Sequence, residues 1–268
     1  MSEWYQKPIE GVLLDITGVL KDGGPTGTIS IEGSVEAVKR LKACAGLQVR
    51  FCTNETTITR KQLLAELTGF GFDVQESEIF SPIPAVCQIL QNRGLRPHLL
   101  VANACMPDFA DVDQTNPNCV VIADAESNFS YENLNKAFQL LMSLEKPVLF
   151  SLGKGKYYKH GTELVLDAGP FMKGLEYACD ITAEVVGKPD KAFFNAVMQD
   201  MGLSPDQCVM VGDDIVGDVG GAQGAGMRGV QVRTGKYRSK DDSHPTVQAD
   251  GRVDNLAQAV DYILTNRT

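Results

Sequence analysis

The sequence predicts a doubly wound α/β core into which a second, smaller α/β domain is inserted. Short apolar runs alternate with longer amphipathic stretches near both ends of the 268-residue chain. This alternation of strand and helix is typical of a parallel sheet that helices cover on both faces. Between the two ends, a middle segment of the chain has strands and helices of its own, which is enough for a separate domain.

The elements of the predicted core follow one another in the order strand, helix, strand, helix, in the N-terminal part and again in the C-terminal part. They are a strand at 11–16, a helix through 35–41, a strand at 49–54, a helix through 63–67, a strand at 209–214, a helix that ends in a glycine cluster, a strand at 229–234 and a final helix from near Asp254.

The inserted domain is predicted to span residues 84–183, which leaves residues 1–83 and 184–268 for the core. Its predicted elements are strands at 99–103, 119–123 and 147–152 and helices around 131–143 and 170–179.

The composition limits the classes of function. Hydrophobic residues make up 43% of the chain and charged residues 22%, which is close to the average for folded proteins and argues against disorder. Asp and Glu (34) outnumber Lys and Arg (25), so nucleic acid is not an expected partner. No apolar run approaches the roughly 18 residues of a membrane span, and no membrane partner is expected.

The seven cysteines favour a reduced, cytoplasmic chain, because their number is odd and no C-x-x-C arrangement occurs. A nuclear location is left open.

Asp15 is the first candidate for chemistry. It follows the apolar run G-V-L-L and comes three residues before Gly18, which suits a tight turn. Such a carboxylate lies at the carboxyl edge of a parallel sheet, where open α/β folds bind their ligands, and the position suits a nucleophile. The alternative is that Asp15 only caps the next segment.

The second candidate is the segment V-G-D-D-I-V-G-D, which carries Asp213, Asp214 and Asp218 after another apolar strand. Several carboxylates at one strand end repel one another unless a cation or hydrogen bonds offset their charge. Hard oxygen ligands without His or Cys indicate Mg²⁺. The alternative is a solvated acidic turn.

Three further residues are candidates for holding phosphate oxygens. Thr53 and Asn54 end the strand V-R-F-C-T-N and offer a hydroxyl and an amide, and Lys188 in V-V-G-K-P offers a charge. Each taken singly is an ordinary turn or surface residue. Only their combination with the carboxylates gives them weight.

Together these segments resemble the haloacid dehalogenase-like phosphatases, whose motifs run nucleophilic Asp, Ser/Thr, Lys and an acidic pair in this chain order. The resemblance covers the whole chain. The long insert resembles the C2-type cap of that superfamily, and L-D-A-G-P-F-M-K-G-L-E-Y-A followed by V-V-G-K-P is typical of its NagD-like branch. The fold that this implies is a Rossmann-like core with an α/β cap.

The resemblance also implies a role for each candidate residue. Asp15 is expected to attack phosphorus and form an aspartyl-phosphate, and Thr17, Thr53, Asn54 and Lys188 are expected to contact the substrate. The implied ligands of Mg²⁺ are Asp15, the backbone carbonyl of Thr17, Asp213, and Asp214 or Asp218 through water.

Five further segments resemble one group of phosphatases within this branch: F-C-T-N-E, N-P-N-C-V-V-I-A-D-A, L-E-K-P-V-L, S-L-G-K-G-K-Y-Y-K and G-D-D-I-V-G-D-V-G-G-A-Q. This closer resemblance implies magnesium-dependent hydrolysis of P–N bonds, in phospholysine, phosphohistidine and imidodiphosphate, and of inorganic pyrophosphate. Two alternatives stay open: a phosphatase for small phosphomonoesters, and a phosphate-binding regulator without turnover. The branch also implies a homodimer formed through the cap. In the cap, Lys154, Lys156, Tyr157 and Tyr158 are candidates for substrate contact.

One departure from the family pattern bears on the substrate. The phosphatases of the superfamily usually have a general acid and base Asp two residues after the nucleophile, and this chain has Thr17 there. A general acid contributes about 10² to 10⁴ in rate, and alkoxide leaving groups need it most. Amine and phosphate leaving groups need it least, which agrees with the implied activity.

Overall fold

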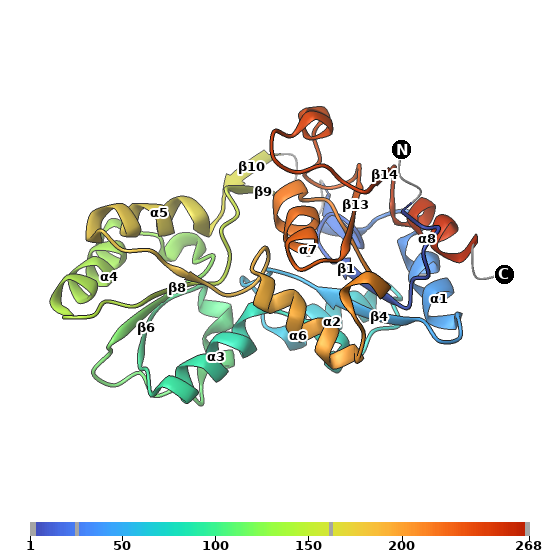
Figure 1. The fold of residues 1–268 in the computed structure, drawn as a ribbon. Helices are drawn as coiled ribbons and strands as arrows, with labels where there is room; N and C mark the ends of the chain where they lie inside the picture. Colours follow the sequence, from blue (N-terminus) through green and yellow to red (C-terminus); the bar gives the residue numbers. More distant parts are fainter. Residues whose placement is uncertain (1–3, 25–26, 161–162, 266–268) are drawn as a thin grey trace.

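The computed structural model describes residues 4–24, 27–160 and 163–265. It confirms the predicted α/β class, with one larger and one smaller parallel sheet lying side by side (Figure 1). The larger sheet has the strand order β14-β13-β12-β1-β4-β5, and the smaller one has the order β11-β8-β7-β6.

The strands of the larger sheet are β1 (Gly11–Asp15), β4 (Gln48–Cys52), β5 (Ile79–Phe80), β12 (Cys208–Gly212), β13 (Arg228–Val232) and β14 (Gly251–Val253). The strands of the smaller sheet are β6 (Pro97–Leu100), β7 (Cys119–Ile122), β8 (Leu149–Ser151) and β11 (Glu184–Val185). Two antiparallel hairpins lie outside these sheets, β2 (Lys21–Gly24) with β3 (Gly27–Ser30) and β9 (Tyr157–His160) with β10 (Glu163–Leu166).

The helices are α1 (Ser34–Ala43), α2 (Arg60–Gly69), α3 (Pro82–Arg93), α4 (Tyr131–Ser143), α5 (Ala168–Cys179), α6 (Lys191–Met201), α7 (Gly221–Gly224) and α8 (Leu256–Thr265). A π-helical turn at Ile215–Gly220 precedes α7.

Helices cover the larger sheet on both faces, and for this reason its central strand is apolar without alternation. Val12 and Leu14 of β1 pack in one cluster with α1, α2 and α8, whereas Leu13 packs in another with α6 and α7. Successive side chains of a strand point to opposite faces, so a strand buried on both sides needs an unbroken apolar run.

The smaller sheet follows the same rule with its own helices. Val121 of β7 packs in a cluster with α3, and Val120 and Ile122 pack in a second cluster with α4 and α5. In Figure 1, α4 and α5 lie on one side of β6 and β8, and α3 lies on the other. The inserted domain therefore has its own hydrophobic core.

The predicted domain division at 83/84 and 183/184 stays a prediction, and the structure adds detail to it. Helix α3 begins at Pro82 and packs on the smaller sheet, and β11, which the prediction put in the core, pairs with β8 of the smaller sheet.

Among the described residues, the structure has no helix that is both long and apolar enough to pass through a membrane.

Candidate active site

Three polar residues come together because three neighbouring strands are parallel. Strand β1 pairs with β12 on one side and with β4 on the other. Asp15 is the last residue of β1, Asp213 follows β12, and Thr53 follows β4. The carboxyl ends of parallel strands meet at one edge of a sheet, so these side chains lie at the same edge.

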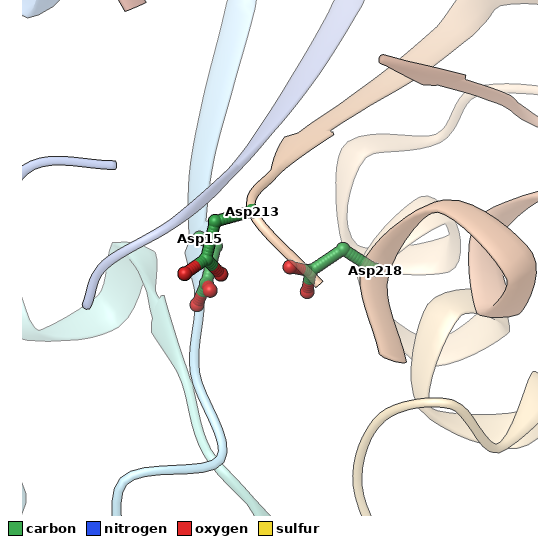
Figure 2. A group of neighbouring side chains, drawn as sticks. All are labelled: Asp15, Asp213 and Asp218. Atoms are coloured by element: carbon green, nitrogen blue, oxygen red, sulfur yellow. The ribbon is translucent and has the colours of Figure 1, made fainter. Parts of the chain in front are cut away.

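Asp15, Asp213 and Asp218 form a buried carboxylate group. One carboxylate oxygen from each lies within 4.8 Å of the others. Figure 2 shows Asp218, which comes from the π-helical turn, directed toward the other two side chains. A close approach by the chain at Gly18 permits this packing, because a Cβ there would lie 2.2 Å from an Asp213 oxygen and the residue has a φ of +92°.

Lys188 is the counter-charge inside this group. Its Nζ lies 2.7 Å from an oxygen of Asp15 and 2.7 Å from an oxygen of Asp218, and it also donates to the carbonyl oxygen of Cys52. The residue is only 4% exposed. Burial opposes its charge, but the carboxylates of Asp15 and Asp218 outweigh this effect and raise the pKa of Lys188, so the ammonium stays protonated.

The carboxylate group fits a divalent cation. Burial, together with the neighbouring carboxylates, raises the pKa of both Asp213 and Asp218. Among the described residues, Oδ1 of Asp213 has no hydrogen-bond partner, although it is buried. Buried carboxylates of this kind are stabilised by pairing or by metal coordination, and hard divalent cations prefer such oxygen ligands.

Asp214 has other contacts, which distinguish it from Asp218. Its Oδ1 accepts hydrogen bonds from the backbone N–H groups of Val216 and Gly217, both at 2.9 Å, and so caps the π-helical turn. Its other oxygen lies 3.0 Å from Nζ of Lys236. Of the two carboxylates that the sequence left as alternatives, the structure thus brings Asp218 to the group with Asp15 and Asp213.

Sequence reasoning missed Lys236. Besides pairing with Asp214, its backbone N–H donates to Asp213 at 2.8 Å. Although burial opposes its charge, Asp214 and Asp213 raise its pKa well above the ordinary value. The one available signal was its place shortly after the strand at 228–232, because this puts it at the same sheet edge.

The remaining predicted residues line one cavity of about 390 Å³ together with the carboxylate group; they are Thr17, Thr53, Asn54, Lys188 and Asp214. Thr53 is buried, and its hydroxyl accepts a hydrogen bond from the backbone N–H of Glu55 at 2.9 Å.

Asn54 forms two hydrogen bonds with the backbone of Lys188. Its amide N–H donates to the carbonyl oxygen of Lys188 at 2.8 Å, and its side-chain oxygen accepts from the backbone N–H of Lys188 at 2.9 Å. Asn54 therefore positions Lys188, and a direct contact with substrate stays a prediction.

The cap supplies the opposite wall of the cavity. The predicted residues Lys154, Lys156, Tyr157 and Tyr158 line it, and so do two carboxylates that the sequence did not single out, Asp124 and Asp167.

Cys52 lies next to this site without entering its chemistry. The residue is fully buried, and burial raises the pKa of its thiol. This favours an inert thiol.

Comparison with known proteins identifies the family and the fold. Family models match two parts of the chain: one of haloacid dehalogenase-like hydrolases matches residues 12–114, and one described as HAD-hydrolase-like matches residues 185–259. Among solved structures, a 4-nitrophenylphosphatase from Thermotoga maritima has a TM-score of 0.83 at 22% identity, covering 95% of this chain and 97% of that chain. NagD from Escherichia coli K-12 has a TM-score of 0.77 at 19% identity, with coverages of 94% and 98%. At these identities the two structures support the fold alone.

Relatives at higher identity extend along nearly the whole chain. A Bos taurus protein named phospholysine phosphohistidine inorganic pyrophosphate phosphatase is 59% identical over 98% of this chain and 98% of its own length. The Homo sapiens protein of the same name is 58% identical over the same shares. A Bos taurus protein named haloacid dehalogenase-like hydrolase domain-containing protein 2 is 40% identical over 97% of both chains. The chain therefore belongs to the haloacid dehalogenase-like hydrolase family, in the branch of the proteins named phospholysine phosphohistidine inorganic pyrophosphate phosphatase.

Proposed function

We propose that the chain is a magnesium-dependent phosphatase that hydrolyses P–N bonds, in phospholysine, phosphohistidine and imidodiphosphate, and inorganic pyrophosphate. The names of relatives at 53–59% identity support phospholysine, phosphohistidine and inorganic pyrophosphate as substrates. One observation carries the catalytic part: the buried carboxylate of Asp15, in contact with Lys188, lies beside two further carboxylates at the carboxyl edge of the sheet.

In the proposed reaction, an oxygen of Asp15 attacks phosphorus while the P–N bond, or the bridging P–O bond of pyrophosphate, breaks. The leaving group takes the electron pair of that bond, and an aspartyl-phosphate forms. Water then hydrolyses the acyl phosphate, which releases phosphate and restores the carboxylate. The charge of Lys188 and the hydroxyls of Thr17 and Thr53 offset the negative charge on the phosphoryl oxygens.

Asp15, Asp213 and the backbone carbonyl of Thr17 would hold the Mg²⁺, with Asp218 or Asp214 acting through water. When bound, the ion supplies positive charge that lessens the repulsion between the carboxylates and the phosphoryl group. The contacts of Asp214 with the π-helical turn and Lys236 favour Asp218 for this role.

The test is phosphate release by the purified protein from N-ε-phospholysine, pyrophosphate and an alkyl phosphate, with Mg²⁺ and with EDTA. We expect release from the first two to exceed release from the alkyl phosphate and to disappear with EDTA. Asp15→Asn should abolish turnover, provided that mass spectrometry excludes deamidation. Thr17→Asp should improve turnover of the alkyl phosphate selectively, because it restores a general acid.

Other outcomes would favour the alternatives. A preference of the unmodified protein for the alkyl phosphate would contradict the proposal and indicate a phosphomonoesterase. Tight phosphate binding without release from any substrate would indicate a regulator.

We further propose a cytoplasmic homodimer formed through the cap, and leave a nuclear location open. The exposed side chains of Tyr131 in α4 and Tyr177 in α5, at 85% and 89%, support an interface on the two adjacent cap helices. Sedimentation equilibrium of the full chain tests the dimer, and Tyr177→Glu should shift it toward the monomer.

A further inference from the structure

The cap wall of the active-site cavity contains a buried carboxylate for which the proposed mechanism has no role. Asp124 follows β7, at the carboxyl edge of the smaller sheet, and lines the same cavity as Asp15 of the larger sheet. Phosphorus is bound at the Asp15 side, so the cap wall is where a leaving group is expected.

The contacts of Asp124 hold it in place. Its Oδ1 accepts a hydrogen bond from the backbone N–H of Glu126 at 3.0 Å, and its side chain is also hydrogen-bonded to Tyr158. Its own backbone N–H donates to the hydroxyl of Thr56 at 3.2 Å, in the core loop that follows β4. The carboxylate is therefore fixed relative to the core loop that carries Thr53 and Asn54.

Asp124 and Tyr158 differ in the charge that they bring to the cavity. Asp124 is only 7% exposed. Burial and the nearby Asp124 raise the pKa of Tyr158, so its hydroxyl stays protonated and donates to the carboxylate. Glu55 and Asp167 add negative charge nearby, and Lys236, which also lines the cavity, offsets part of the charge of Asp167. Lys154 and Lys156 also line the cavity but are exposed, so water screens their charge.

We propose that Asp124, oriented by the Tyr158 hydroxyl, is a specificity-determining residue that favours leaving groups carrying positive charge over anionic leaving groups. This inference rests on the proposed function and refines its substrate class. The nitrogen of a phosphoramidate binds a proton from water before the P–N bond breaks, and it leaves with the bonding electron pair as an amine or imidazole. A buried carboxylate attracts that cationic nitrogen and repels the phosphate that leaves from pyrophosphate.

The test compares kcat/KM for N-ε-phospholysine, pyrophosphate and imidodiphosphate. Asp124→Asn keeps the shape of the side chain and removes its charge. We expect it to lower kcat/KM for phospholysine about tenfold and to leave pyrophosphate unchanged or faster. Tyr158→Phe should act in the same direction with a smaller effect. The control is Asp111→Asn, which removes a carboxylate from an exposed position of the cap that does not line this cavity.

Imidodiphosphate separates charge from bond type, because it has a P–N bond but an anionic leaving group. It should respond to Asp124→Asn as pyrophosphate does. A response like that of phospholysine would overturn the inference, and so would equal changes for all three substrates or no change at all in a variant whose thermal unfolding matches the unmodified protein. The activity of the unmodified protein tests the proposed function separately. The inference about Asp124 concerns only how the ratios of kcat/KM between substrates change in the variant.

Discussion

Asn54 binds the backbone of Lys188 on both sides, once as a donor and once as an acceptor. Asn54→Asp keeps the size and the acceptor but replaces the donor by a second oxygen, which would repel the carbonyl of Lys188. We expect a loss of about 1–3 kcal/mol in stability and a fall of about 10- to 100-fold in kcat, because Lys188 moves relative to Asp15. Denaturant unfolding and phosphate release measure the two effects.

Asn118 offers a matched control, since its side-chain oxygen accepts from the backbone N–H of Arg96 at 2.8 Å and a carboxylate can do the same. Asn118→Asp should leave both quantities nearly unchanged. If Asn54→Asp behaved like this control, the positioning role of Asn54 would be wrong.

A second prediction at this scale concerns the stability of Asp124 variants against pH. Burial raises the pKa of Asp124 above its ordinary value of 3.8. The folded state then binds the proton more tightly than the unfolded state, so the contribution of this group to stability falls as pH rises from about the ordinary value through the raised one. Asp124→Asn lacks this loss.

As pH rises through this interval, the stability of the variant should therefore increase relative to that of the unmodified protein, by about 1 kcal/mol or less. At higher pH, the difference in stability between the two proteins should stay constant. Thermal unfolding at a series of pH values from 3 to 8 measures the difference. A difference that shrinks as pH rises would contradict the raised pKa.

Residues differ in how far the sequence can predict their place in the site. Asp15 is the last residue of its strand, and Thr53 and Asp213 directly follow theirs. Parallel pairing brings neighbouring strand ends to one edge, so the strand pattern together with the order of the motifs was sufficient to group these residues. Asp124 and Lys236 also come after strands, β7 and β13. The sequence does not show, however, that the edge of the smaller sheet lies across the cavity from Asp15, or that the turn after β13 brings Lys236 to Asp214, because tertiary structure defines both arrangements.

At the scale of elements, the π-helical turn at Ile215–Gly220 brings Asp218 back to the strand end from which the chain has just left. π-helical turns are rare and concentrate at functional sites. The glycine at the end of β12 makes room for this return, since a Cβ on Gly212 would lie 2.2 Å from an oxygen of Asp218.

Gly212→Ala should therefore displace Asp218 and with it the contact of that residue with Lys188. We expect kcat/KM to fall at least tenfold and stability to fall by about 1–3 kcal/mol. Gly224→Ala is the control, because a Cβ at that position of α7 meets nothing within 4 Å. Equal activities of the two variants would contradict this prediction, because they would show that the π-helical turn can accommodate a Cβ at position 212 without displacing Asp218.

Element boundaries were less predictable than element types. The segment I-V-G-D-V-G reads as the beginning of an ordinary helix, because the sequence pattern does not distinguish a π turn from an α turn. Likewise, β11 has only two residues and belongs to the cap sheet through its pairing with β8, a long-range contact. Strands of such length carry almost no periodic signal.

For the whole molecule, the important feature is that the core and the cap have separate hydrophobic clusters, while residues of both line the cavity. Figure 1 shows the two parts side by side. Several polar contacts join them. The thiol of Cys105 donates to the carbonyl oxygen of Thr56 at 3.0 Å, and the guanidinium of Arg238 lies 4.9 Å from the ring centre of Tyr157. Because each body has its own core, we expect their thermal transitions to be separable.

This separation sharpens the test of the cation site, which lies wholly in the core. Without a cation, the buried carboxylates repel one another, and a ligand that binds only the folded state stabilises it by about 2.7 kcal/mol at a concentration 100 times its Kd. Mg²⁺ at that level should raise the Tm of the core transition by about 5–10 °C and leave the cap transition almost unchanged.

Asp213→Asn removes one charge, but the oxygen of the new amide side chain can still accept the hydrogen bond from the backbone N–H of Lys236. We therefore expect the variant to fold. Without Mg²⁺, this variant should unfold at the same temperature as the unmodified protein or higher, because one buried charge is gone. With Mg²⁺, it should show little further increase. Calorimetry with both proteins, with and without the ion, measures the four values, and an equal Mg²⁺ response in the two proteins would contradict a cation site that includes Asp213.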